Sequence, residues 1–149
     1  MSKVDLQRHL AEMYQMPGHK LRRVNQIIVA KFYSKCAGTD ITPVQFSAMT
    51  AIAAEGEIDA TRLSQMIAFD RSTLGAVIDR LEKRGAIKRS PHPSDRRIKI
   101  LSLTDTGHEI LEEVRPLVKS SQEDFLNMLD PKEREDLQRI LQKIIDLSK

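Results

Sequence analysis

The side chains with the clearest chemical potential lie near the start of residues 70–85. Arg71, Ser72, Thr73 and Ala76 combine one guanidinium with small or hydroxyl-bearing side chains. Small side chains allow a helix to approach closely, while hydroxyl and guanidinium groups can bond to base edges and phosphates. This combination favours contact with a DNA major groove. An ordinary surface helix could carry the same residues, so the neighbouring elements must decide between the two interpretations.

Residues 70–85 have the pattern of one amphipathic helix. Asp70 stands at the N-cap position, and Gly85 follows a basic last turn, where a left-handed residue commonly ends a helix. Apolar side chains recur at i, i+3, i+4 and i+7 and predict one buried stripe. The members of this stripe are Leu74, Val77, Ile78 and Leu81.

The flanking segments predict the elements that would position this helix. Residues 59–68 indicate a short capped helix whose inward side chains are Leu63, Met66 and Ile67. Downstream, residues 86–90 and 97–103 flank a turn-rich tip and predict a β-hairpin, with Ile98 and Ile100 among its alternating apolar positions. A short helix, a turn, a second helix and a hairpin make a winged helix-turn-helix.

Charge is concentrated on the same part of the chain. The net charge of the 149 residues is only +3, but residues 60–100 carry ten Lys or Arg against four Asp or Glu. The remaining residues carry fourteen against seventeen. A local basic excess is typical of a surface that faces phosphates, although a solvated basic face is the alternative.

Residues 94–107, Ser-Asp-Arg-Arg-Ile-Lys-Ile-Leu-Ser-Leu-Thr-Asp-Thr-Gly, resemble the signature of the MarR family of winged-helix transcriptional regulators. The Asp-Arg-Arg followed by Leu-x-Leu-Thr-x-x-Gly is the most specific part. Residues 79–85, Asp-Arg-Leu-Glu-Lys-Arg-Gly, also match, and the likeness in element order covers nearly the whole chain. The resemblance implies a homodimeric regulator that binds a pseudo-palindromic double-stranded DNA operator, most often as a repressor released by a small ligand.

The pattern and the resemblance together give a set of expected DNA contacts. We expect Asp95 to shape the wing by pairing with one of two neighbouring arginines, leaving the other to enter a minor groove. The sequence does not assign these two roles. The expected DNA-binding residues are Arg62, Arg71, Ser72, Thr73, Ala76, Arg80, Arg96 and Arg97.

The rest of the chain predicts a mainly α fold with one small β-hairpin wing. At this length we expect a single domain, residues 1–149, with the winged helix-turn-helix at 42–103 and dimerisation helices at 17–37 and 104–149. Thr42 begins a capping box, Pro116 should kink a helix spanning 105–129, and Asp130 should cap the last helix. Residues 1–16 indicate either a mobile arm or a short helix. The apolar faces of the terminal helices favour a partner subunit over folding back on their own domain.

A small-molecule site is the second expectation. Residues 18–23, Gly-His-Lys-Leu-Arg-Arg, precede an apolar run at 27–32, and residues 40–46 read Asp-Ile-Thr-Pro-Val-Gln-Phe. These segments look like those of the MarR branch that regulates breakdown of aromatic carboxylic acids and their thioesters. That resemblance implies a small anionic aromatic ligand. A carboxylate could be held by His19, Arg22 or Arg23, with Phe46 and Met49 lining the ring. Alternatively, the basic residues face solvent or pair across a dimer.

Other chemistry is poorly supported by the sequence. The single cysteine, Cys36, excludes an internal disulfide and suits a reducing cytoplasm; we expect it to pack rather than to sense oxidants. The four histidines lack metal-binding spacing, and no nucleophile and base form a catalytic pattern, so we expect no metal, cofactor or enzymatic activity. No signal peptide or membrane span is expected. The alternatives are a redox-sensing regulator, an enzyme using the helical pocket, and a winged-helix module that binds protein or RNA.

Overall fold

The computed structural model describes residues 2–148, which form two compact units. The winged-helix unit contains residues 36–118. The helical unit contains the chain up to Lys35 and the chain from Lys119 onward, so the boundary falls within one long helix, α6.

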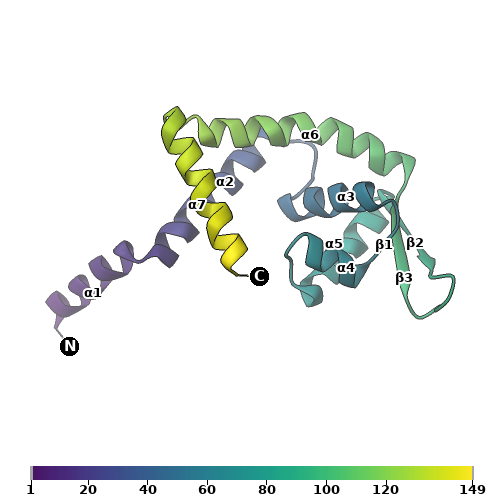
Figure 1. Ribbon diagram of the computed structural model, residues 1–149, viewed down its shortest axis with the longest axis horizontal. Coiled ribbons are helices and arrows are strands. Elements are labelled where there is room, and N and C mark those ends of the chain that lie inside the picture. Colours follow the sequence, from purple (N-terminus) through teal and green to yellow (C-terminus); the bar gives the residue numbers. More distant parts are fainter. Residues whose placement is uncertain (1, 149) are drawn as a thin grey trace. The chain divides into compact units, whose positions relative to one another are not determined.

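The winged-helix unit has a small sheet beside three helices, and its hairpin extends away from them (Figure 1). The strands are antiparallel in the order β1-β3-β2, which places β3 in the centre. The elements are α3 (Pro43–Glu55), β1 (Ile58–Asp59), α4 (Ala60–Met66), α5 (Arg71–Lys83), β2 (Ile87–Pro91), β3 (Lys99–Leu103) and the first part of α6 (Asp105–Leu126). The expected mainly α winged helix-turn-helix is therefore confirmed, while the short strand β1 was not foreseen.

Helix α5 forms as the sequence predicts. The Asp70 side chain caps it, and Gly85 follows it with φ +76°, a conformation that residues with a Cβ rarely adopt. The four residues of its apolar stripe are all buried, and Leu74 and Leu81 are fully enclosed. Burial of this stripe fixes which face of α5 remains exposed.

Two inward-facing assignments near α5 are wrong. Met66 is 39% exposed because α4 has only seven residues and buries Leu63 and Ser64 instead. Ile98 is 41% exposed because β3 begins one residue later, at Lys99. Strict alternation fails in β3, where Ile100 and Leu101 are both buried. A central strand is covered by neighbouring elements more fully than the half-buried strand that alternation describes.

The helical unit is built from α1 (Lys3–Gln15), α2 (Pro17–Lys35), the end of α6 and α7 (Pro131–Leu147). Ser2 and Asp5 form a capping box that starts α1, so residues 3–15 are a helix rather than an unstructured arm. Asp130 caps α7 as expected, and α6 continues through Pro116 but ends at Leu126, short of the expected 129. The Lys35 ammonium lies 2.9 Å from the Asp124 carboxylate and links α2 to α6.

Burial in the helical unit is sparse. Neither α1 nor α7 has a buried residue, and α2 has only Phe32. Large apolar side chains on α7 are exposed, including Ile144 at 54%. No helix within residues 2–148 is long and apolar enough to cross a membrane.

Candidate nucleic-acid interface

The tip of α5 is organised by the carboxylate of Asp70. Its Oδ2 atom accepts hydrogen bonds from the Thr73 backbone N–H at 2.9 Å, from the Thr73 hydroxyl at 2.8 Å and from the Ser72 hydroxyl. Hydrogen bonds from Ser72 and then Thr73 hold the pKa of Asp70 below its ordinary value. Both hydroxyl hydrogens are thus committed, so Ser72 and Thr73 present oxygen lone pairs outward rather than the donors expected from sequence.

A basic hollow lies at the amino-terminal end of α5. Arg71 lines it together with Arg97 and Lys99 from the wing and the start of α4, around a volume of about 240 Å³. Lys99 was missed by the sequence reasoning. It lies two residues beyond Arg97, so alternation along the wing strand would have placed both on one side.

The wing tip distinguishes its two arginines. Arg97 donates to Asp95 from Nε at 3.0 Å and from Nη2 at 2.9 Å, and its backbone N–H also bonds to that carboxylate. The bonds from Arg97 lower the pKa of Asp95 and raise the pKa of Arg97. Arg96 is exposed and has no ion-pair partner among residues 2–148. Arg97 is therefore engaged in shaping the tip, while Arg96 is available to a partner molecule.

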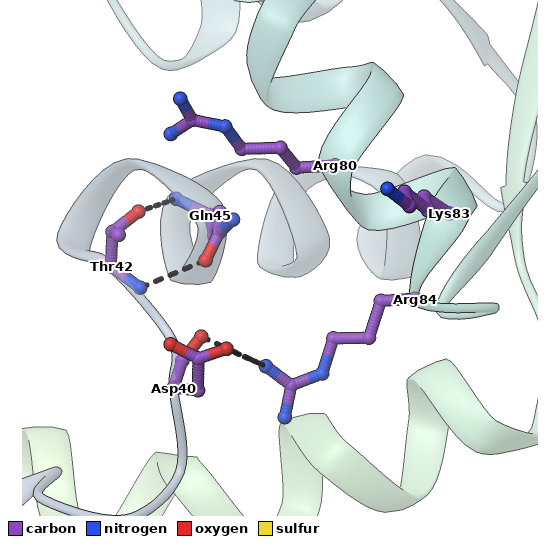
Figure 2. Close-up of a pocket in the computed structure, with 6 residues that line it drawn as sticks. All are labelled: Asp40, Thr42, Gln45, Arg80, Lys83 and Arg84. Atoms are coloured by element: carbon purple, nitrogen blue, oxygen red, sulfur yellow. Dashed lines mark hydrogen bonds and ion pairs between the residues drawn. The ribbon is translucent and has the colours of Figure 1, made fainter.

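A second basic hollow lies at the carboxy-terminal end of α5, as Figure 2 shows. Its volume is about 380 Å³, and Arg80 is one of the residues that line it. Lys83, Thr42 and Gln45 also line it, and none of them was among the expected site residues. The two other expected contacts are exposed elsewhere: Ala76 on α5, and Arg62 on α4 with its Nε 4.0 Å from the Glu55 carboxylate.

Two further arginines hold α5 in place. Arg89 on β2 pairs with the carboxylates of Asp79 and Glu82, the latter at 2.7 Å. Arg84 donates to the Thr39 carbonyl oxygen at 2.6 Å and to the Asp40 carbonyl oxygen at 2.8 Å. These bonds tie the carboxy-terminal half of α5 to the sheet and to the loop before α3. Partners on two sides thus fix the orientation of α5.

The expected small-molecule residues fall into two groups. His19, Arg22 and Arg23 lie together in the helical unit, where they line a hollow of about 500 Å³ with Met13 and Tyr14. The Tyr14 and His19 ring centroids are 5.1 Å apart, and Arg22 Nη2 lies 3.4 Å from His19 Nδ1.

Phe46 and Met49 do not line this hollow; they lie on α3 of the winged-helix unit. Met49 is a core residue there, with 1% of its surface exposed. A ligand site that joins all five residues therefore stays a prediction.

Cys36 is buried, and burial raises the pKa of its thiol. A raised pKa keeps the thiol protonated, whereas oxidant sensing depends on the thiolate. The structure therefore favours a packing role for Cys36.

Comparisons with known proteins agree with this geometry. The MarR family model matches residues 41–99, which include α3, α4, α5 and most of the wing. Transcriptional regulator HosA of Escherichia coli O111:H- is 30% identical over 86% of this chain and 93% of its own. The HTH-type transcriptional repressor NicR of Pseudomonas putida is 29% identical over 91% of this chain and 85% of its own.

A solved structure with the same fold is that of BpsR from Bordetella bronchiseptica, described as regulated in its DNA binding by 6-hydroxynicotinic acid. Its TM-score is 0.84 at 30% identity, covering 89% of this chain and 95% of that one. These relatives are named as transcriptional regulators and not as enzymes. With the winged helix-turn-helix and its basic face, they establish that this chain belongs to the MarR family of DNA-binding transcriptional regulators.

Proposed function

We propose that this protein is a cytoplasmic, homodimeric repressor whose hold on an operator is released by a small aromatic carboxylate. The observation that carries the DNA part is the exposed polar face of α5, with a basic hollow at each end. In this proposal α5 enters the major groove, and Arg71, Ser72, Thr73 and Ala76 lie at its base edges.

The wing supplies the second part of the DNA contact. Arg96 enters the adjacent minor groove, because its guanidinium has no partner in the described chain and stands at a hairpin tip. Asp95 and Arg97 hold the tip in shape, and Arg62 faces the phosphates from α4. The side-chain oxygens of Ser72 and Thr73 accept bonds, which favours the exocyclic amino groups of adenine or cytosine over carbonyl-bearing edges.

The helical unit supplies the dimer in this proposal. Its terminal helices leave apolar faces exposed, and a second copy of the chain covers them. A two-fold dimer presents two copies of α5 to successive major grooves, so the operator should be a pseudo-palindrome with half-sites about one helical turn apart.

The ligand part of the proposal rests on the hollow lined by His19, Arg22 and Arg23. Guanidinium and imidazole groups can hold a carboxylate, while Tyr14 and Met13 offer an aromatic and an apolar wall. The hollow is within the usual size range for small-molecule sites. A ligand that prefers the conformation with misplaced recognition helices would shift the population and weaken DNA binding.

A mobility-shift assay on the DNA flanking this protein's own gene tests the proposal. The wild-type protein should retard that duplex, and 6-hydroxynicotinic acid or benzoate should reverse the shift, with benzamide as the uncharged control. Coupling of the usual size would lower operator affinity by roughly 5–150-fold. Arg22→Gln should raise the carboxylate concentration needed for release. No retarded complex would contradict DNA binding, and equal responses to benzoate and benzamide would contradict the carboxylate site.

A further inference from the structure

The hollow at the carboxy-terminal end of α5 contains more positive charge than the structure neutralises. Arg80, Lys83 and Arg84 line it against one carboxylate, that of Asp40. Arg84 is already occupied by two backbone carbonyl oxygens and lies 3.8 Å from the Asp40 carboxylate. Within the described part of the chain, Arg80 and Lys83 have no ion-pair partner. The cavity is therefore lined by two cationic side chains that are not neutralised by a carboxylate within the described residues.

A buried amide adds a donor on the opposite wall. Gln45 is only 7% exposed, and its Oε1 atom accepts the Thr42 backbone N–H at 3.0 Å as half of a capping box. Among residues 2–148 the Gln45 amide nitrogen has no hydrogen-bond acceptor, yet it is not sealed from solvent. The Thr42 hydroxyl accepts from the Gln45 N–H at 3.3 Å, which leaves its own hydrogen free to donate. The two walls of the cavity thus offer donors and positive charge, the composition of an anion site (Figure 2).

The position of Arg80 and Lys83 on α5 identifies the source of the anion. Thr73, Ala76, Arg80 and Lys83 stand at i, i+3, i+7 and i+10, which is one stripe of a helix surface. Seven residues separate Thr73 from Arg80, and also Ala76 from Lys83, or about 10 Å along the helix axis. That distance is comparable to the width of a major groove, about 12 Å. If the first half of the stripe faces base edges, its second half reaches the backbone that bounds the groove.

We propose that this hollow seats one backbone phosphate of the operator, held by Arg80 and Lys83 on one side and by Thr42 and Gln45 on the other. The inference rests on the proposed DNA-binding function and assigns it a phosphate contact on α3, outside the helix-turn-helix itself. The contact fixes the depth and tilt of α5 in the groove, because it joins two elements of the rigid winged-helix unit to one point of the duplex.

The first test measures DNA affinity against salt concentration for Arg80→Gln and Lys83→Gln. The probe is a labelled duplex that the wild-type protein selects from a random-sequence library. Each variant should weaken binding about tenfold, as expected for loss of a charged hydrogen bond. Each should also flatten the log–log salt slope by about one unit per bound protomer. Lys132→Gln on α7 removes the same charge far along the sequence and should change neither value.

Gln45→Glu separates the phosphate contact from helix capping. Glutamate is a good capping-box residue at this position, so thermal stability should be retained or raised. The amide donor, however, becomes a carboxylate facing a phosphate, so affinity for the duplex should fall by at least as much as in Lys83→Gln. If Gln45→Glu kept full affinity, Gln45 would not face a phosphate and the proposal would be overturned.

A duplex with single neutral methylphosphonate linkages locates the contact. At one linkage in each half-site, the Lys83→Gln effect should disappear, because the charge it meets is already absent. The alternative is that the hollow binds free phosphate instead of a DNA phosphate. Competition by inorganic phosphate at constant ionic strength tests this alternative. The proposal would be overturned if Lys83→Gln abolished saturable binding of inorganic phosphate but left duplex affinity unchanged, because the hollow would then be a site for free anions. Failure of DNA binding as a whole would appear as no selected duplex for the wild-type protein.

Discussion

Helices α5 and α7 carry the same apolar pattern with opposite outcomes. On α5 the i, i+3, i+4, i+7 stripe begins at Leu74 and is buried in every member. On α7 the equivalent stripe begins at Leu137, yet α7 has no buried residue. Three of its four members are exposed in the single chain: Ile140, Leu141 and Ile144.

The difference lies in the neighbours that each unit provides. The winged-helix unit covers α5 with the sheet, α3 and α4, and so completes its own core. In the helical unit, α2 and the end of α6 lie beside α7, and apolar hollows remain between them, lined by Val24, Phe125 and Leu137 among others. An apolar stripe predicts that a helix face will be buried. Whether the same chain or a partner subunit buries it depends on the neighbours that the chain packs against that face.

The largest expected effect comes from making the α7 face polar. Ile140→Glu combined with Ile144→Glu should convert a dimer to a monomer, because charged groups would enter the proposed interface. Operator affinity should fall by a factor on the order of 10²–10⁴, since the two recognition helices no longer bind together. Light scattering measures the mass and circular dichroism the retained helices. A dimer that persists in the double mutant would contradict the assignment of α7 to the dimer interface. Deletion of residues 131–149 is a second test, and a dimer that survives it would contradict the same assignment.

The matching change on α5 should act on folding instead. Leu81→Ala removes a fully enclosed side chain and should lower the free energy of unfolding by about 2–5 kcal/mol. Urea unfolding of the protein, followed by circular dichroism, measures this loss of free energy. Leu141→Ala on α7 provides the comparison, and it should cost much less in a dilute monomer. Equal losses would mean that α7 is buried within its own chain after all.

Arg71→Ala should affect DNA binding without affecting either core. Arg71 is exposed at the tip of α5, and loss of a base contact costs about 1–3 kcal/mol. The measurement is operator affinity by fluorescence anisotropy, with mass and melting temperature unchanged. Unaltered affinity would remove Arg71 from the residues that read the operator.

The two wing arginines should respond differently. Arg96→Ala should weaken DNA binding and flatten the salt slope by about one unit per protomer, with no loss of stability. Arg97→Ala should also disturb the wing, because it removes the partner of Asp95. Amide hydrogen exchange at the tip distinguishes the two outcomes. Reversed behaviour would exchange the roles assigned to the two arginines.

The smallest effect concerns the acid stability of the α5 tip. The Asp70 pKa is lowered in the folded protein, so its cap contributes stability above the unfolded pKa and loses it as the pH falls through the folded pKa. Exchange protection of the Thr73 amide should therefore decline on acidification. Asp70→Asn keeps a capping oxygen that does not titrate, so its protection should be flatter with pH. Equal pH profiles for the two proteins would exclude Asp70 as the titrating group.

Much of the fold could be predicted from the sequence because short-range signals within each element specify it. Capping residues and periodicity placed α3, α5 and α7, since these signals depend on hydrogen bonds and spacing within one helix. The one element that the sequence did not predict within the described residues, β1, has a weak local signal, because it has two residues and exists through its pairing with β3. Met66 is the last residue of α4, and Ile98 precedes the first residue of β3, so both lie at element boundaries, where an ideal period no longer predicts burial.

For the candidate site, the sequence by itself determined the recognition helix, its polar tip, the basic wing and, through family motifs, the class of protein. Each depends on residue type and short spacing, which the chain specifies without distant contacts. Only the tertiary structure decided that Asp95 takes Arg97 and leaves Arg96, and that Asp70 commits the hydroxyls of Ser72 and Thr73. It also brought Thr42 and Gln45 beside Lys83, some forty positions away in the chain. Rotamers and partner choice depend on which groups meet in space, and spacing along the sequence cannot rank them.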